Sequence, residues 1–249
     1  MALEIKPTPI LKGRSVDRFI RILEENQDKR ISPEEKAEMQ KMLEKTLKKA
    51  KLWLPLILID TCSMLRLTED IDLRDFNCGN EDLNDFLHNS ALSYDNALLG
   101  RSYVWTLDKD PRHIMCFFTV SNDSLRLQNL TNSTQKRIKS KIARQKHRST
   151  YPAVLIGRLG VNLSLKQQRQ PGISSIGDQL MTFIKAWFSS QQNKTGCRFI
   201  IVDAYNKPEV LRYYERNGFR FLESKGEESK NTGYSPLTRS MFFDLIQVS

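Results

Sequence analysis

The chain has 249 residues, 39% of them hydrophobic, and a net charge of +10 at neutral pH. That length suits one large domain, or a medium domain with a small appendage, and the composition excludes wholesale disorder. The longest apolar run, Leu52–Ile59, is far too short for a membrane-spanning helix, which needs about twenty residues. We find no export signal, and four scattered cysteines without a CxxC pair favour a reducing, cytoplasmic location.

The first 51 residues predict two amphipathic helices. Ser15 can cap the first helix, and Ser32, Pro33 and Glu35 have the spacing of a capping box that starts the second. Two helices of this size cannot bury their apolar stripes alone, so we expect them to pack on another domain. Residues 1–51 are therefore predicted to be a helical segment, which an apolar linker, residues 52–63, joins to the rest of the chain.

Residues 64–249 predict a single mixed domain. The helices that we expect, from periodicity and end signals, are Glu81–Tyr94, Ser133–Gln145, Ile173–Phe188 and Lys207–Phe219. The expected strands are Ser102–Asp108, His113–Val120, Ala153–Val161, Arg198–Ala204 and Arg239–Val248. Because strands and helices alternate around one core, the predicted fold class is α/β, with α+β mixing.

The positive charge is concentrated in one part of the chain. Between Ser124 and Gly177 there is no acidic residue, and Lys136–Arg148 alone carries seven basic ones. Such a run is either a solvated helix face or a contact with a polyanion, and the sequence leaves both interpretations open. The candidate RNA-binding residues are Lys136, Arg137, Lys139, Lys141, Arg144, Lys146, Arg148 and Arg158.

A second candidate site lies where the strand Ala153–Val161 is followed by a loop and a helix. Gly172 and Gly177 allow a ligand to approach the backbone closely, and Arg169 adds a positive charge just upstream. Free N–H groups at the start of a helix bind phosphate well. The alternative is ordinary helix capping by the serines of this segment.

Two further groups of residues could carry chemistry. Asn206 follows a predicted strand, and the next helix carries Tyr213 and Tyr214, either of which could donate a proton or pack in the core. Cys78, beside Gly79, is better interpreted as a small buried residue in a turn than as a nucleophile. No pair of histidines has metal-ligand spacing, so no metal is expected.

These motifs together resemble those of the GNAT N-acetyltransferases. The matching stretches are FNCGNEDLNDFL, YPAVLIGRLGV, GISSIGDQLM and FIIVDAYNKPEVLRYYERNGF, and they are most similar to the acetyltransferase toxins of bacterial toxin–antitoxin pairs. The resemblance implies acetyl-CoA as cosubstrate and Tyr214 as the general acid. The residues it implies for acetyl-CoA binding are Leu159, Gly160, Val161, Arg169, Gly172, Ser174, Ser175, Ile176, Gly177, Asp178 and Asn206.

The loop before the second motif departs from the family pattern, because it is longer by about half a dozen residues. Two registers, one starting at Arg169 and one at Gly172, are compatible with it, and the following helix favours the second. The individual pyrophosphate contacts therefore stay open.

The resemblance implies transfer of an acetyl group to the α-amine of an aminoacyl-tRNA, which blocks translation. An acetyltransferase of protein or small-molecule amines, and a non-catalytic nucleic-acid-binding protein with the same fold, remain alternatives. The first fifty residues resemble the short helical proteins encoded just upstream of some such toxins. The segment is therefore either a regulatory, antitoxin-like part that acts in cis or an extension that only stabilises the fold, and an antitoxin acting in trans remains an alternative. The sequence does not decide which amino acid is modified or whether the chain forms a homodimer.

Overall fold

We describe the protein from a computed structural model, which places residues 58, 61–142, 148–166, 175–190, 193, 195–222 and 236–248. The two helices predicted in residues 1–51 lie outside the described residues. In the described part of the chain, seven strands form one sheet in the order β1-β2-β3-β4-β5-β7-β6. Their bounds are β1 Cys62–Arg66, β2 Arg101–Leu107, β3 Asp110–Arg126, β4 Thr150–Val161, β5 Phe199–Tyr205, β6 Arg220–Phe221 and β7 Thr238–Asp244.

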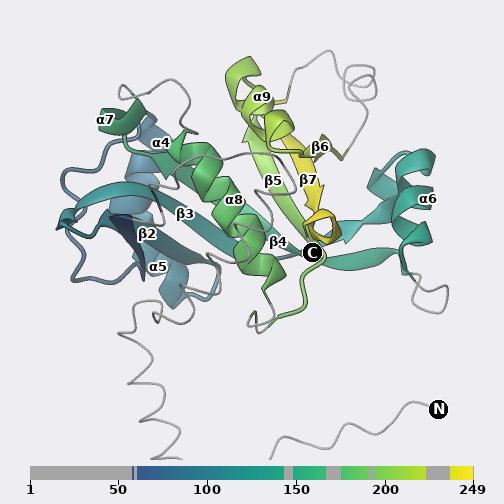
Figure 1. Cartoon of the computed structure of the whole chain (residues 1–249), viewed down its shortest axis with the longest axis horizontal. Coiled ribbons are helices and arrows are strands. Elements are labelled where there is room, and N and C mark those ends of the chain that lie inside the picture. The colour runs from purple at the N-terminus through teal and green to yellow at the C-terminus, as the bar shows by residue number, and fades with distance from the viewer. Residues whose placement is uncertain are drawn as a thin grey trace, which may run out of the picture.

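Helices cover both faces of this sheet (Figure 1). The described helices are α4 Glu81–Asp85, α5 Ala91–Asn96, α6 Asn132–Ser140, α7 Leu163–Lys166, α8 Ile176–Ser189 and α9 Pro208–Arg216. Helices α4 and α5 are parts of one predicted helix, in which Phe86–Ser90 form a π-helical turn. None of the described helices is long and apolar enough to cross a membrane.

The core divides according to the two faces. Because side chains alternate along a strand, Phe118 and Ile156 point to the face that α8 and α9 cover. Phe117 points to the opposite face and packs under α4 and α5. Farther along that second face, Ile138 of α6 packs with Tyr151 and Phe199. Each helix therefore belongs to a definite side of the sheet.

The expected elements are present, with shifted ends. β1 begins at Cys62, inside the stretch predicted to be linker. β3 continues past Val120 to Arg126, because the polar residues Ser121–Ser124 still pair with β4. β7 stops at Asp244, where a short 3-10 turn replaces the end of the predicted strand. The mixed α/β fold class is confirmed.

The hairpin between β2 and β3 has a tighter turn than expected. The predicted strands leave residues 109–112 as their connection, but residues 110–112 belong to β3, and Asp108–Lys109 form the turn. Pro111 is tolerated because it is the second residue of the strand, where one missing N–H costs little.

The strand pair β4 and β5 creates the main irregularity of the sheet. The two strands run parallel and pair only from Ala153↔Phe199 to Ile156↔Val202. Beyond that point β4 continues to Val161 along β3, whereas β5 continues to Tyr205 along β7. The strands therefore splay apart, and the edge of β4 from Gly157 to Val161 that faces β5 has no strand partner among the described residues.

Candidate active site

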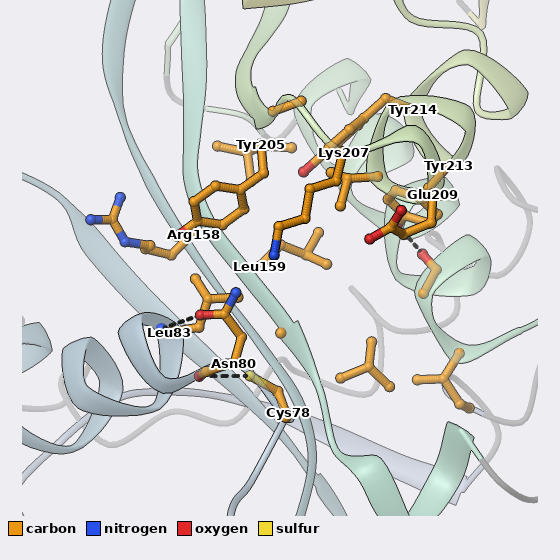
Figure 2. A pocket seen from close by; sticks show the side chains of 18 of the residues that line it. Cys78, Asn80, Leu83, Arg158, Leu159, Tyr205, Lys207, Glu209, Tyr213 and Tyr214 are labelled. Atoms are coloured by element: carbon orange, nitrogen blue, oxygen red, sulfur yellow. Dashed lines mark hydrogen bonds between the residues drawn. The ribbon is translucent and has the colours of Figure 1, made fainter. Parts of the chain in front are cut away.

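The splay opens into a cleft of about 1530 Å³. One of its walls is the free edge of β4, Gly157–Val161, and another is the end of β5. On one face of the sheet the start of α8 and the inner side of α9 line it. On the other face it reaches the turn Cys78–Asn80 and helix α4 (Figure 2). The cleft thus passes through the sheet and is open to both faces.

Tyr214 and Tyr213 are adjacent on α9 but are placed differently. Tyr214 is 8% exposed, lines the cleft, and points its ring into it (Figure 2). Burial raises the pKa of Tyr214 well above the usual value for tyrosine, so its hydroxyl stays protonated at neutral pH. A buried phenol that keeps its proton and faces a cleft is suited to donate that proton.

The hydroxyl of Tyr213 is already occupied. It donates a hydrogen bond of 2.6 Å to the carbonyl oxygen of Gly177 in the first turn of α8. Burial also raises the pKa of Tyr213. Tyr213 therefore links α9 to the start of α8, and it leaves Tyr214 as the tyrosine of the pair that faces the cleft.

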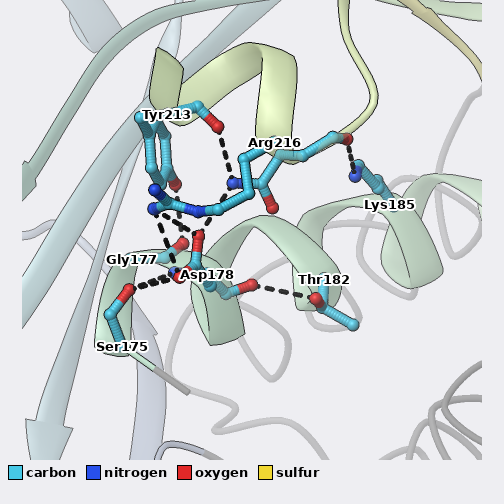
Figure 3. A network of polar contacts seen from close by, with 8 residues as sticks. Ser175, Gly177, Asp178, Thr182, Lys185, Tyr213 and Arg216 are labelled. Carbon is cyan, nitrogen blue, oxygen red and sulfur yellow. Dashed lines mark hydrogen bonds and ion pairs between the residues drawn. The ribbon is translucent and has the colours of Figure 1, made fainter. Parts of the chain in front are cut away.

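The start of α8 is held by a polar network around Asp178 (Figure 3). Ser175 caps the helix by accepting the Asp178 N–H, and its hydroxyl donates to the Asp178 carboxylate at 2.7 Å. Asn217 and Arg216 of the α9 end donate to the same carboxylate at 2.9 and 3.1 Å. Burial would raise the pKa of Asp178, but these three hydrogen bonds outweigh it and hold the pKa below its usual value.

This network holds the first turn of α8 beside the cleft. The first turn of a helix has N–H groups without intrahelical partners, and here Ser175 caps that of Asp178. Ile176 and Gly177 both line the cleft. The start of this 14-residue helix can therefore receive an anion, with the helix dipole behind it.

Packing requires glycine at position 160, which is also part of the cleft wall. A Cβ there would lie 2.5 Å from the Phe117 ring and 3.3 Å from the Cβ of Cys78. Only glycine lets β4 pass between these two side chains. Cys78 is 3% exposed, and its thiol contacts Asn84 Oδ1 at 3.2 Å. It is a buried residue in a turn, as its place beside Gly79 indicated.

The cleft brings together most of the residues predicted for acetyl-CoA that the structure describes. Its lining includes Leu159, Gly160, Val161, Ser175, Ile176, Gly177 and Tyr214. Asp178 and Asn206 are not in the lining: Asp178 belongs to the network above, and Asn206 donates from Nδ2 to the carbonyl of Pro236 at 2.9 Å. Arg169, Gly172 and Ser174 lie outside the described residues, and the register of their loop stays a prediction.

The predicted RNA-binding residues do not form one patch. Lys136, Arg137 and Lys139 lie on α6 and Lys141 directly follows it, whereas Arg144 and Lys146 lie outside the described residues. Arg148 follows that undescribed stretch, just before β4. Arg158 lies in the cleft, at the other end of β4. From Thr150 to Gly157 the strand spans roughly 23 Å, at about 3.3 Å per residue.

Several cleft residues were missed by sequence reasoning. They are charged or polar side chains, four of them at or next to the end of an element and Arg212 within α9: Asp82, Tyr205, Lys207, Glu209 and Arg212. No spacing marks them in the sequence, since their meeting depends on how far β4 and β5 diverge. Among the described residues, no group of three or more His, Cys, Asp or Glu side chains could hold a metal.

No protein-family model matches the sequence, and no curated protein is similar to it. Solved structures are similar in fold. A Tyr-to-Phe mutant of KacT has a TM-score of 0.57 and 18% identity, over 76% of this chain and 98% of that one. AtaT complexed with acetyl-methionyl-tRNAfMet has a TM-score of 0.54 and 22% identity, over 75% and 96%. AtaTR bound with AcCoA has a TM-score of 0.51 and 21% identity, over 76% and 96%.

These similarities define the class of fold. The chain has the mixed α/β fold of the GNAT acyltransferases, with the splayed strands β4 and β5 at its centre. Its similarity to GNAT toxins such as KacT and AtaT, which the motifs predicted, is confirmed at the level of the fold.

Proposed function

We propose that the protein is an acetyl-CoA-dependent N-acetyltransferase whose acceptor is the α-amine of an aminoacyl-tRNA. One observation carries the proposal: Tyr214, protonated and buried, faces a cleft that joins the free edge of β4 to the start of α8. Neighbours with the same fold were solved with acetyl-CoA and with acetyl-methionyl-tRNAfMet, which supports both the cosubstrate and the acceptor.

Different parts of the cleft fit the pyrophosphate of acetyl-CoA and its pantetheine arm with the thioester. The N–H groups of Ile176 and Gly177 suit the pyrophosphate, because they carry partial positive charge at a helix start and belong to residues that line the cleft. The free edge of β4 offers backbone N–H and C=O groups to the amides of the pantetheine arm. A backbone N–H near Val161 would polarise the thioester carbonyl and stabilise the oxyanion that forms there.

The reaction needs few side chains. The acceptor nitrogen, after losing a proton to water, attacks the thioester carbonyl carbon and forms the new C–N bond. The C–S bond then breaks, and the thiolate takes the proton of the Tyr214 hydroxyl. The second proton of the amine leaves to solvent, and Tyr214 takes a proton from solvent to regain its neutral form. Holding both reactants in one cleft supplies the proximity that such a bimolecular step requires.

An acetyl-transfer assay tests the proposal. Purified protein is incubated with radiolabelled acetyl-CoA and, in separate reactions, with aminoacylated tRNA, deacylated tRNA and a mixture of small amines and peptides. We expect label only on the aminoacylated tRNA, and much less with Tyr214→Phe. Label on small amines or peptides alone would support an acetyltransferase of protein or small-molecule amines. No transfer to any amine would contradict the assignment as an acetyltransferase.

The N-terminal part is proposed to regulate this enzyme in cis. Leu58, in the linker that joins this part to β1, is anchored to α8: its side chain is fully buried, and its N–H donates to Gln179 Oε1 at 3.0 Å. Gln179 lies two residues after Gly177, so the anchor is one helical turn or less from the proposed pyrophosphate site. A tethered segment acts at high effective concentration, and weak docking on the enzyme is therefore enough.

Two shortened chains separate inhibition from stabilisation. A chain beginning at Leu58 keeps the anchor, whereas one beginning at Met64 loses Leu58 and Cys62, both fully buried. We expect the first to be more active than the full chain at a similar melting temperature, and the second to be less stable. Equal or lower activity of the Leu58 chain would contradict inhibition in cis.

A further inference from the structure

Three side chains from three elements meet at the α4 side of the cleft. Tyr205, at the end of β5, donates a hydrogen bond of 2.6 Å to Oδ2 of Asp82 in the first turn of α4. Nε of Arg158, on β4, lies 4.0 Å from the same oxygen, and Figure 2 shows the Tyr205 ring directed toward Arg158. The contact joins residues 123 positions apart and bridges two walls of the cleft.

This cluster lies on the side of the sheet opposite to the proposed coenzyme site. The turn before α4 packs directly on β4: Cys78 would contact a Cβ at Gly160, and Asn77 accepts the N–H of Leu163 at 2.8 Å. Helix α4 is therefore held against the β4 segment that is expected to bind the thioester. Since α8 and α9 occupy the other face, the acceptor has to approach the thioester from the α4 face.

Asp82 is placed to meet an incoming cation. Its side chain is 62% exposed and lines the cleft, and the contacts of Tyr205 and Arg158 with it are made to Oδ2. The acceptor amine arrives as an ammonium ion, and an exposed carboxylate held through one oxygen is a suitable partner for it. Two basic residues add positive charge to the lining: the ammonium group of Lys207 points into the cleft (Figure 2), and Nε of Arg158 lies near Asp82.

We propose that Asp82 binds the α-ammonium of the acceptor, that Tyr205 positions Asp82 by its hydrogen bond, and that Arg158 and Lys207 bind a neighbouring anion. The matching ligand carries an ammonium close to a phosphodiester, as the aminoacylated nucleotide end of a tRNA does. The proposal rests on the proposed function, which named the acceptor but none of the residues that recognise its amine.

A competition experiment separates recognition of the ammonium from recognition of the RNA. Aminoacyl-tRNA is deaminated to the hydroxyacyl form, which keeps every phosphate and loses only the charged amine. For the wild-type protein the hydroxyacyl form should compete about tenfold less well than the aminoacyl form. For Asp82→Asn the two should compete about equally. Glu81→Gln, which removes the neighbouring charge of the same helix turn outside the cleft, should behave like the wild type.

Tyr205→Phe tests the positioning role, because it keeps the ring and removes the hydrogen bond to Asp82. We expect the KM for aminoacyl-tRNA to rise several-fold, with kcat and acetyl-CoA affinity unchanged. In the double variant with Asp82→Asn it should add little, since both changes remove the same interaction. Tyr94→Phe, at a partly exposed tyrosine outside the cleft, is the matched control.

The two proposals can fail separately. Absence of acetyl transfer by the wild-type protein contradicts the proposed function. Transfer by the wild type together with unchanged discrimination in Asp82→Asn overturns the present inference alone. A fall in acetyl-CoA affinity, measured by calorimetry for either variant, would also overturn it, because the cluster would then belong to the coenzyme side.

Discussion

The two sides of the cleft are built in different ways. On the side of α8 and α9, the Asp178 carboxylate accepts hydrogen bonds from three side chains, and Tyr213 is bonded to the backbone of Gly177. On the α4 side, Asp82 has one hydrogen bond and one distant cation, and more than half of its side chain is exposed. The first side is rigid before any ligand binds, whereas the second can rearrange around one.

This difference agrees with the two ligands proposed. A cosubstrate of constant structure is bound best by a preorganised site, which loses little entropy on binding. A large acceptor that approaches from solvent needs exposed, adjustable contacts. Substitutions on the first side should therefore affect the coenzyme or the chemistry, and substitutions on the second should affect the KM of the acceptor.

The largest expected effect comes from the pair of adjacent tyrosines. Tyr214→Phe should lower kcat by about 10²–10⁴-fold, the usual contribution of general acid catalysis, without changing acetyl-CoA affinity. Tyr213→Phe should leave the chemical step nearly intact and weaken the start of α8, because it removes the bond to Gly177. Single-turnover rates and calorimetry on both variants check this. A loss of kcat in Tyr213→Phe alone would reassign the proton donor.

The sequence predicted this pair but could not choose between its members on packing grounds. Both tyrosines follow the same helical pattern, and the family resemblance alone favoured Tyr214. Which tyrosine faces the cleft depends on Gly177, 36 residues before Tyr213, whose carbonyl oxygen accepts the hydrogen bond of the Tyr213 hydroxyl. By contrast, the end of α9 has a local cause, because Gly218, two residues after it, has a φ of +81°, a conformation that favours glycine.

Asp82 and Tyr205 show the limit of prediction from this one sequence. Each is an ordinary polar residue at the end of an element, and neither has a local partner at a recognisable spacing. Their contact arises because β4 and β5 stop pairing at Ile156 and Val202. The buried strands were predictable from their apolar runs. The residue at which two such strands stop pairing was not, because no sequence pattern in either strand indicates it.

A somewhat smaller effect is expected from Gly177→Glu. A Cβ at Gly177 would lie 3.3 Å from the ring of Tyr213, and the added carboxylate would repel an anion at the start of α8. Acetyl-CoA affinity should fall by about ten- to a hundredfold in calorimetry. Gly196→Glu is the matched control, because a Cβ there meets nothing within 4 Å. Unaltered affinity in Gly177→Glu would place the pyrophosphate elsewhere.

Neutralising the basic helix should have an effect on tRNA alone. Replacement of Lys136, Arg137, Lys139 and Lys141 by glutamine should reduce tRNA affinity and lower its salt dependence by about 0.7–0.9 log units per lost phosphate contact. Acetyl-CoA binding should not change, because α6 lies at the end of β4 away from the cleft (Figure 1).

The control for this charge change is Lys109→Gln, in the turn between β2 and β3, combined with Arg112→Gln, near the start of β3. If affinity and salt slope fall equally per charge in both variants, total charge explains tRNA binding and α6 has no special role. If neither falls in the α6 variant, the basic run is only a solvated face.

The smallest effect concerns the stability of the rigid side in acid. The pKa of Asp178 is lower in the folded protein than the value of about 3.9 in an unfolded chain, so its hydrogen bonds stabilise the fold above that pH. The stabilisation is lost as pH falls through the lowered folded pKa, when the carboxylate takes a proton.

In Asp178→Asn the amide cannot titrate, so this part of the acid sensitivity should be absent. Melting temperatures between pH 6 and pH 2 should therefore fall less steeply in Asp178→Asn than in the wild type, by a few degrees. Asp70→Asn, at an exposed carboxylate in the turn that follows β1, should follow the wild-type curve. Parallel curves for all three proteins would mean that the network holds α8 through its geometry rather than through the charge of Asp178.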